Sequence, residues 1–171
     1  MIQEQDEGTH PFPDGFDAWN ESLFFDWIGP DGTQAGHCRI GVHPALGTVW
    51  FWFYVLHEGH WACINEPALP YSEKYTLEWG YDSPALRFRR RVIRALQTNV
   101  LEVHGTGQWL EGPKSGQSVA LQIQLTFEAA GPPHGMAART IPWMNGETFH
   151  AARYEQPCDV VGDISVDGDA V

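Results

Sequence analysis

The stretch TVWFWFYVL, residues 48–56, decides the fold of this chain. It contains five aromatic residues and no charge, glycine or proline, and turn-forming segments flank it, HPALG at 43–47 and HEG at 57–59. Such a run predicts a β-strand that is buried on both faces. Because successive side chains of a strand point to opposite faces, Trp50, Trp52 and Tyr54 lie together on one of them. Their rings would either fill a thick core or line a cavity that holds a large apolar molecule.

Further strand signals follow at short intervals, separated by glycine and proline. Residues 21–28 and 35–42 flank the turn GPDG and predict a hairpin. In residues 118–128 apolar and polar side chains alternate, as in an antiparallel strand with one solvated face. The pattern predicts an all-β fold, either a lipocalin-like antiparallel β-barrel or a strongly curved β-sandwich. It would form a single domain over residues 19–171, after an irregular arm at 1–18. The other segments that predict strands are 60–64, 75–81, 86–93, 98–104, 108–110 and 159–166.

The end of the sequence reads as an interrupted hairpin. Residues 164–166 alternate into Asp167-Gly168, a strong signal for a two-residue turn. Only residues 169–171 follow, so the strand ending at Val166 would keep unpaired backbone groups along its edge. Three alternatives stay open: the segment frays, another chain supplies the missing strand, or the strand was lost. The second alternative predicts a homodimer, or a companion chain that carries a second barrel domain.

Charge and composition exclude several classes of partner. With 22 acidic against 10 basic residues, the net charge is −12, which disfavours nucleic acid and anionic membrane surfaces. No apolar run reaches the roughly 20 residues that span a membrane, and the acidic N-terminus is unlike a signal peptide, so we expect a cytoplasmic location. Cys38, Cys63 and Cys158 lack metal-ligand spacing, and neither GxGxxG nor a P-loop occurs. We therefore expect no metal and no cofactor.

Two carboxyl groups lie in an otherwise apolar strand. Glu21 and Asp26 are five residues apart and face opposite sides, so at least one would point to the interior. An apolar pocket would raise the pKa of that carboxyl and keep it protonated, as an acid that protonates an alkene requires. The alternative is that both carboxyls bind turn backbone or lie at a barrel rim.

Half of the basic residues fall in the segment 87–94. On a strand, Arg87, Arg89 and Arg91 would share one face and Arg90 would lie on the other. The arginines form either a solvated surface paired with acids or an anion clamp for a carboxylate, a diphosphate or a CoA-type ligand. An inward-facing Arg90 would need a buried carboxylate partner or a ligand.

The histidines carry weaker signals. His57-Glu58-Gly59-His60 is one residue short of the zinc motif HExxH and lies in a turn, which favours two exposed histidines over a metal site. His104 follows the apolar stretch of a strand, where it would act either as a general base beside a ligand or as a structural residue.

Several segments resemble a known family. Residues 19–26, 36–44, the aromatic strand, 125–134 and 154–157 resemble the hydroxyneurosporene synthase (carotenoid 1,2-hydratase) and AttH-like group of lipocalin-type proteins. The resemblance implies two barrels in tandem with a ligand pocket near their junction. It also implies hydration of isoprenoid alkenes or cofactor-free cyclisation of polyenes. This chain resembles only the first barrel, whereas the family's acid residues commonly lie in the second. Tyr154 and Glu155 match the segment that joins the two barrels, which implies that they lie near the pocket.

The leading hypothesis is a cofactor-independent lyase or isomerase that acts on an apolar unsaturated molecule of isoprenoid, polyene or steroid type. The reaction would be an acid-assisted hydration, dehydration or cyclisation. Glu21, Asp26 or Glu155 would donate the proton, and the substrate would contact Trp50, Trp52, Tyr54, His104, Arg90 and Tyr154. Two alternatives stay open, namely a non-catalytic module that binds a hydrophobic ligand and a structural subunit of a two-chain complex.

Overall fold

The structure, a computed structural model, describes residues 2–8, 10, 19–71, 78–142 and 148–170, without the side chains of 78 and 137–152. Two short 3-10 turns, η1 (Glu4–Glu7) and η2 (Pro44–Leu46), accompany the strands. In this part of the chain, no helix is long and apolar enough to cross a lipid bilayer. The strands are β1 (Glu21–Ile28), β2 (Ala35–His43), β3 (Thr48–His57), β4 (His60–Pro70), β5 (Glu78–Asp82), β6 (Leu86–Arg94), β7 (Thr98–Trp109), β8 (Ser118–Ala129), β9 (His134–Pro142), β10 (Thr148–Glu155), β11 (Cys158–Val166) and β12 (Asp169–Ala170).

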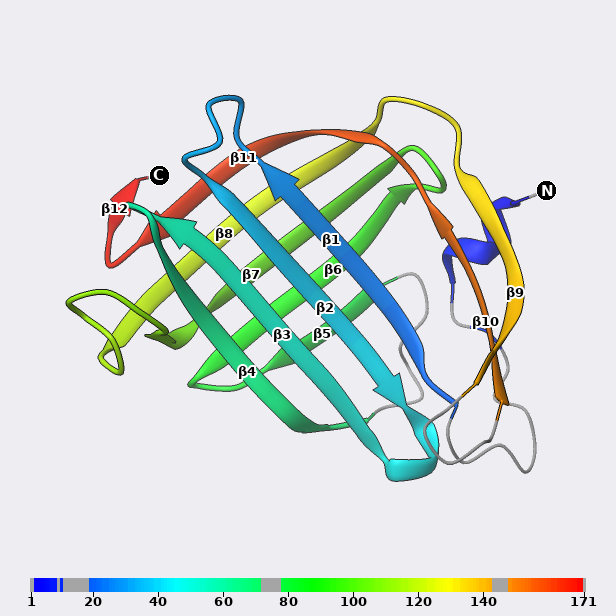
Figure 1. The fold of residues 1–171 in the computed structure, drawn as a ribbon, viewed down its shortest axis with the longest axis horizontal. Coiled ribbons are helices and arrows are strands. Elements are labelled where there is room, and N and C mark those ends of the chain that lie inside the picture. Colours follow the sequence, from blue (N-terminus) through cyan, green and yellow to red (C-terminus); the bar gives the residue numbers. More distant parts are fainter. Residues whose placement is uncertain (1, 9, 11–18, 72–77, 143–147, 171) are drawn as a thin grey trace.

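Ten strands form one antiparallel sheet in the order β1-β2-β3-β4-β7-β8-β11-β12, with β6 also paired to β7 and β5 to β6. Residues 98–105 of β7 pair with β6, whereas Gln108 and Trp109 pair with β4. Strands β6 and β4 therefore pair with successive parts of the same edge of β7. Gly107 lies at this corner, where a Cβ would come 2.2 Å from the carbonyl oxygen of Cys63. The sheet therefore curls into a half-barrel, and Figure 1 shows β1–β4 crossing in front of β6–β8. The all-β prediction with a strongly curved antiparallel sheet is confirmed.

The core lies between the two halves of the curled sheet. Phe51 of β3 stacks on Phe88 of β6 with 4.4 Å between ring centroids, and Phe25 of β1 packs on Phe127 of β8 at 5.0 Å. The alternation in residues 118–128 places its apolar set in this core, as predicted. Aromatic rings from both halves thus fill the space that the sheet encloses.

The aromatic strand β3 is buried on one face only. Its phenylalanines and valines point into the core, whereas Trp50, Trp52 and Tyr54 lie half-buried on the outer face. The prediction that the strand is buried on both faces, with these three rings lining the interior, is therefore wrong. An antiparallel sheet can cover one face with the core and leave the other to solvent, and the core here takes the phenylalanine and valine set.

Several local predictions are confirmed. β1 and β2 form the predicted hairpin, and the segment 86–93 is part of strand β6. Asp167 and Gly168 both have positive φ, 53° and 91°, as a two-residue hairpin turn requires, and β12 pairs with Ser165 and Val166 beyond it. The sequence does not predict the hairpin of β9 and β10 or the turn η1 inside the N-terminal arm. Residues 75–77 of one predicted strand lie outside the described residues.

Candidate functional site

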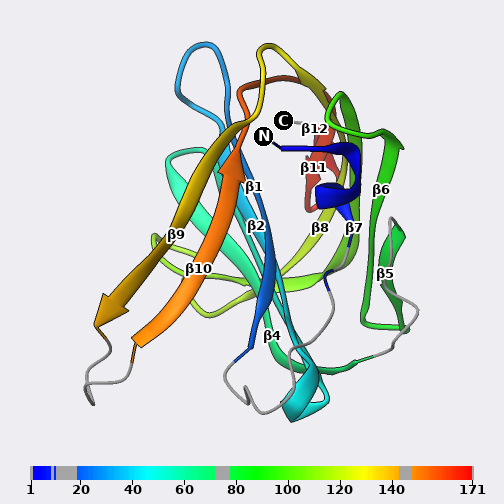
Figure 2. The same cartoon turned by 90° about the vertical axis from the view of Figure 1, so that its right-hand side faces the viewer.

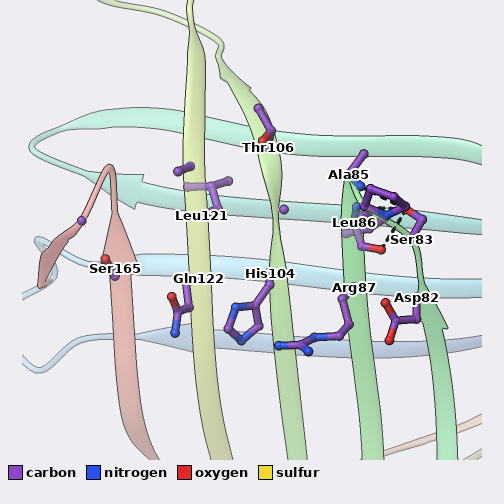
Figure 3. Close-up of a pocket in the computed structure, with 14 residues that line it drawn as sticks. Asp82, Ser83, Ala85, Leu86, Arg87, His104, Thr106, Leu121, Gln122 and Ser165 are labelled. Carbon is purple, nitrogen blue, oxygen red and sulfur yellow. Dashed lines mark hydrogen bonds between the residues drawn. The ribbon is translucent and has the colours of Figure 1, made fainter.

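A groove crosses the outer face of the sheet over β6, β7, β8 and β11 (Figure 3). Its volume is about 510 Å³. The turn at 82–86 borders one end of the groove, and Gly168, in the turn before β12, borders the other. Half of the 14 residues that line the groove are polar, among them Asp82, Arg87, His104, Gln122 and Ser165.

Strand register brings these five side chains into one row. Asp82 pairs with Arg87, Arg87 with His104, His104 with Gln122, and Gln122 with Ser165. Adjacent strands lie about 4.8 Å apart, so a row across five strands spans about 19 Å. Figure 3 shows Arg87 extending toward His104, with Gln122 on the other side of the imidazole. A molecule lying along the row would therefore meet hydrogen-bonding groups from several strands at once.

Hydrogen bonds fix the two ends of the groove. At one end, the Ser83 hydroxyl accepts from the amides of Ala85 and Leu86 at 3.3 and 3.1 Å and donates to the Leu86 carbonyl at 3.1 Å. At the other end, the Asp167 carboxylate accepts from the Ala120 amide at 2.9 Å, and the Asp167 amide donates to the Ala120 carbonyl at 2.8 Å. Both turns are thus tied to their own sheet, which gives the groove a defined shape without a ligand.

Charge pairing distinguishes Arg87 from other arginines of β6. Arg91 pairs with Glu102 at 2.6 Å and Arg94 with Glu128 at 3.4 Å. Within the described residues, neither Arg87 nor Arg89 has a carboxylate within 4 Å. The predicted facing is confirmed, because Arg87, Arg89 and Arg91 lie outward and Arg90 inward. The guanidinium of Arg87 is therefore available to an anion in the groove.

The three carboxyls predicted as acids do not lie together. The Asp26 side chain is 75% exposed, and its carboxylate forms a hydrogen bond with His37 Nδ1 at 2.6 Å. The Glu155 side chain is 64% exposed and lies 3.4 Å from the guanidinium of Arg153. Glu21 binds the ring and the backbone amide of His10. Asp26 faces outward because the neighbouring Phe25 takes the inward position of β1, whereas Glu21 shares the face of Phe25 and its side chain is 15% exposed. Asp26 and Glu155 are solvated, so neither lies in the expected apolar pocket.

The outer aromatic face of β1–β3 is built around Arg39. Its guanidinium carbon lies 4.7 Å from the ring centroid of Trp52 and 5.3 Å from that of Phe24. Trp50 stacks on Trp52 at 5.9 Å and packs against the tilted ring of His43 at 4.0 Å. Burial lowers the pKa of His43, and the charge of Arg39 lowers it further. Tyr54 lies apart from Trp50, beside His37 at 6.3 Å. These side chains cover one another, and none of the three predicted acids is among them.

A buried cluster unites two other predicted residues, Arg90 and Tyr154. Both contact the carboxylate of Glu7, which belongs to η1 and is 2% exposed. The prediction that an inward Arg90 requires a buried carboxylate is confirmed. Burial lowers the pKa of Arg90, an effect that Glu7 opposes; burial also raises the pKa of Tyr154, to which Glu7 adds. Sequence reasoning missed Glu7, because acids in an N-terminal arm are typical of a solvated segment.

Sequence reasoning also missed most of the groove. The sequence predicts a ligand contact for His104 and, as one of two alternatives, an anion clamp on the arginine face that includes Arg87, but it does not predict Gln122, Ser165 or Asp82 as site residues. A signal for two of them exists, since Arg87 lies on the arginine-rich face and Gln122 on the polar face of an alternating strand. The register that brings them together is not encoded in either pattern.

Comparisons with known proteins give a family but no characterised relative. No curated protein and no solved structure matches this chain. A family model described as "Domain of unknown function (DUF7064)" matches residues 3–171, which include the groove and the buried cluster. The chain therefore belongs to the DUF7064 family.

Proposed function

We propose that this domain is a binding module, and that its outer groove holds a small polar molecule with a phosphate or carboxylate group. The observation that carries the proposal is the guanidinium of Arg87, which lies in a preformed groove beside His104 without a carboxylate partner in the described structure. A guanidinium can bind either anion through two parallel hydrogen bonds. The anionic group would therefore lie between Arg87 and His104.

The remaining side chains of the row define the rest of the ligand. Gln122 and Ser165 each offer a donor and an acceptor, whereas ionised Asp82 only accepts. Hydroxyl or amino groups on either side of the anion would satisfy them. Because the net charge of the chain is −12, the average field repels anions, so selection depends on these local donors. The expected ligand is thus a hydroxylated molecule with one anionic group and not a polyanion.

The test is a titration of the full-length protein, followed by amide chemical shifts, with glucose 6-phosphate, glucose, inorganic phosphate and citrate. We expect saturable shifts at Arg87, His104 and Gln122, strongest with a singly phosphorylated sugar. Arg87→Gln should weaken binding about tenfold or more, because it removes a charge-assisted hydrogen bond. Arg89→Gln is the matched control, since Arg89 lies on the same face of the same strand and does not line the groove.

Two outcomes would contradict the proposal. One is the absence of saturable shifts in the groove with all four probes. The other is an equal loss of affinity in Arg87→Gln and Arg89→Gln, which would indicate general charge attraction. The acid-assisted reaction on an apolar unsaturated substrate, and the partner chain that completes the sheet, stay predictions. Their carboxyls and aromatic rings lie outside the groove.

A further inference from the structure

The buried cluster around Arg90 is separate from the groove, because Arg90 lies on the inner face of β6 and Arg87 on the outer face. Figure 1 shows η1 at one end of the half-barrel beside β9 and β10, and Figure 2 shows it between β10 and β6. Glu7, the last residue of η1, carries its carboxylate into this end of the core. A segment outside the sheet thus supplies the anion that a residue inside the sheet requires.

Groups from three parts of the fold lie around that carboxylate, and two of them donate hydrogen bonds to it. Arg90 Nη2 of β6 donates to one oxygen, and the Leu96 amide, in the turn between β6 and β7, donates to the other at 3.0 Å. The partly buried Tyr154 hydroxyl of β10 lies near enough for the Glu7 carboxylate to raise its pKa. Arg90 Nη1 also donates to the Glu7 carbonyl at 3.1 Å. Such a set of donors fits any carboxylate, whether it belongs to this chain or to another molecule.

The donors are held by the sheet and not by Glu7. Gln156 Nε2 donates to the Leu96 carbonyl at 3.0 Å and to the Gly131 carbonyl at 2.9 Å, which ties the turn to the connection before β11. Leu96 adopts a left-handed conformation with φ 56°, which is uncommon for a residue with a branched side chain. In this conformation the Leu96 amide donates to the Glu7 carboxylate. The site is therefore pre-organised on the sheet side.

The fit of Glu7 leaves one donor unused. Arg90 Nε is buried and has no hydrogen-bond partner among the described residues. The register neighbours of Arg90 are Trp79 and Leu101, both almost fully buried, and Phe88 lies two residues away on the same face. The strand neighbours of Arg90 are thus apolar. A matching ligand combines a carboxylate with an apolar body.

We propose that Arg90, the Leu96 amide and Tyr154 form a binding site for an apolar monocarboxylate, and that Glu7 occupies this site when no ligand is bound. The ligand carboxylate takes the position of the Glu7 carboxylate and displaces η1, while its apolar body lies against the end of the core. No covalent step is involved. The displaced η1 would then report on occupancy of the site.

The first experiment replaces the Glu7 side chain with a free molecule of the same shape. Glu7→Ala should lower the melting temperature of the full chain, and propionate, which carries the missing methylene and carboxylate with one further carbon, should restore about half of the loss or more at saturation. Sodium chloride at equal ionic strength and neutral propionamide should restore little. Glu4→Ala is the matched control, because Glu4 belongs to the same turn and is exposed. In Glu7→Ala/Arg90→Met the effect of propionate should disappear.

The second experiment asks whether a ligand displaces Glu7 in the wild-type chain. Within η1, the amide of Asp6 donates to the Gln3 carbonyl at 2.9 Å and that of Gly8 to the Gln5 carbonyl at 3.2 Å. Octanoate should accelerate hydrogen exchange at Asp6 and Gly8 and leave the Leu96 amide protected. Unchanged exchange in wild type, even with rescue of Glu7→Ala, would overturn the proposal, since the site would then be a cavity made by the substitution.

If Glu7→Ala does not fold alone, the folded fraction by near-ultraviolet circular dichroism becomes the measured quantity. Propionate that restores this fraction supports the site, and failure of propionate beyond the sodium chloride control overturns it. The groove proposal can be judged separately, because its shifts fall on the outer face and Glu7→Ala leaves Arg87 in place.

Discussion

Arg87 and Arg90 lie three residues apart on β6 and have opposite surroundings. Arg90 is 1% exposed, has apolar strand neighbours and pairs with the carboxylate of Glu7. Arg87 is exposed, lies in a groove and has no carboxylate partner in the described part of the chain. Both arginines belong to the same strand, so the strand itself does not cause this difference. The difference comes from what the curled sheet places above each face.

This contrast separates a charge that holds the fold from a charge that is free for a ligand. A buried guanidinium without an anion is costly, so the fold must bring a carboxylate to Arg90. A solvated guanidinium carries no such requirement, and surface ion pairs contribute little stability. The inner arginine should therefore dominate stability, and the outer one should dominate binding in the groove.

The largest expected effect is at the inner pair. Arg90→Ala should lower the free energy of unfolding by about 3–5 kcal/mol because it leaves Glu7 buried without its cation, whereas Arg87→Ala should change it by about 0.5 kcal/mol or less. The double variant Glu7→Leu/Arg90→Met should recover much of the loss, because an apolar pair needs no compensating charge. Urea unfolding measures all three. Equal losses for Arg87→Ala and Arg90→Ala would break the comparison between the two faces.

How far the sequence predicts these faces depends on the contrast within each strand. In residues 118–128 one set is apolar and the other polar, so the pattern identifies the buried face correctly. In β3 both sets are apolar or aromatic, so the pattern shows which residues share a face but not which face is inward. The hairpin of β1 and β2 is predicted because its turn and both strands are local in sequence.

The candidate sites depend on contacts that local patterns do not contain. Glu7 and Arg90 are 83 residues apart, and the acidic arm that holds Glu7 carries no apolar periodicity that indicates burial. The row in the groove joins five strands, and its membership follows from register, which is set by the packing of the whole sheet. The need of Arg90 for a buried carboxylate could therefore be predicted, but not which side chain supplies it.

A smaller effect is expected from Tyr154, whose hydroxyl lies at the inner site. Burial, and then the Glu7 carboxylate, raise the pKa of Tyr154 above its ordinary value of 10.0. Above that value the unfolded chain loses the phenol proton while the folded chain keeps it, so stability should fall as the pH rises past about 10. Tyr154→Phe should remove this part of the slope in urea unfolding between about pH 9 and 11. A variant that keeps the full alkaline slope would indicate that the hydroxyl is not held at Glu7.

The smallest effect is expected on the outer face, at His43. Burial, and then the charge of Arg39, lower the pKa of His43 below its ordinary value of 6.5. The unfolded chain therefore takes up a proton at a higher pH than the folded chain, and stability falls as the pH drops below 6.5. His43→Gln should flatten the decline measured by urea unfolding between about pH 7 and 5, and Arg39→Gln should flatten it in part. The His43 ring packs against Trp50 on the outer aromatic face. An unchanged slope in His43→Gln would therefore mean that this face is open enough to solvate the imidazolium. The contrast between the two faces of the sheet would then be sharper than the burial of His43 indicates.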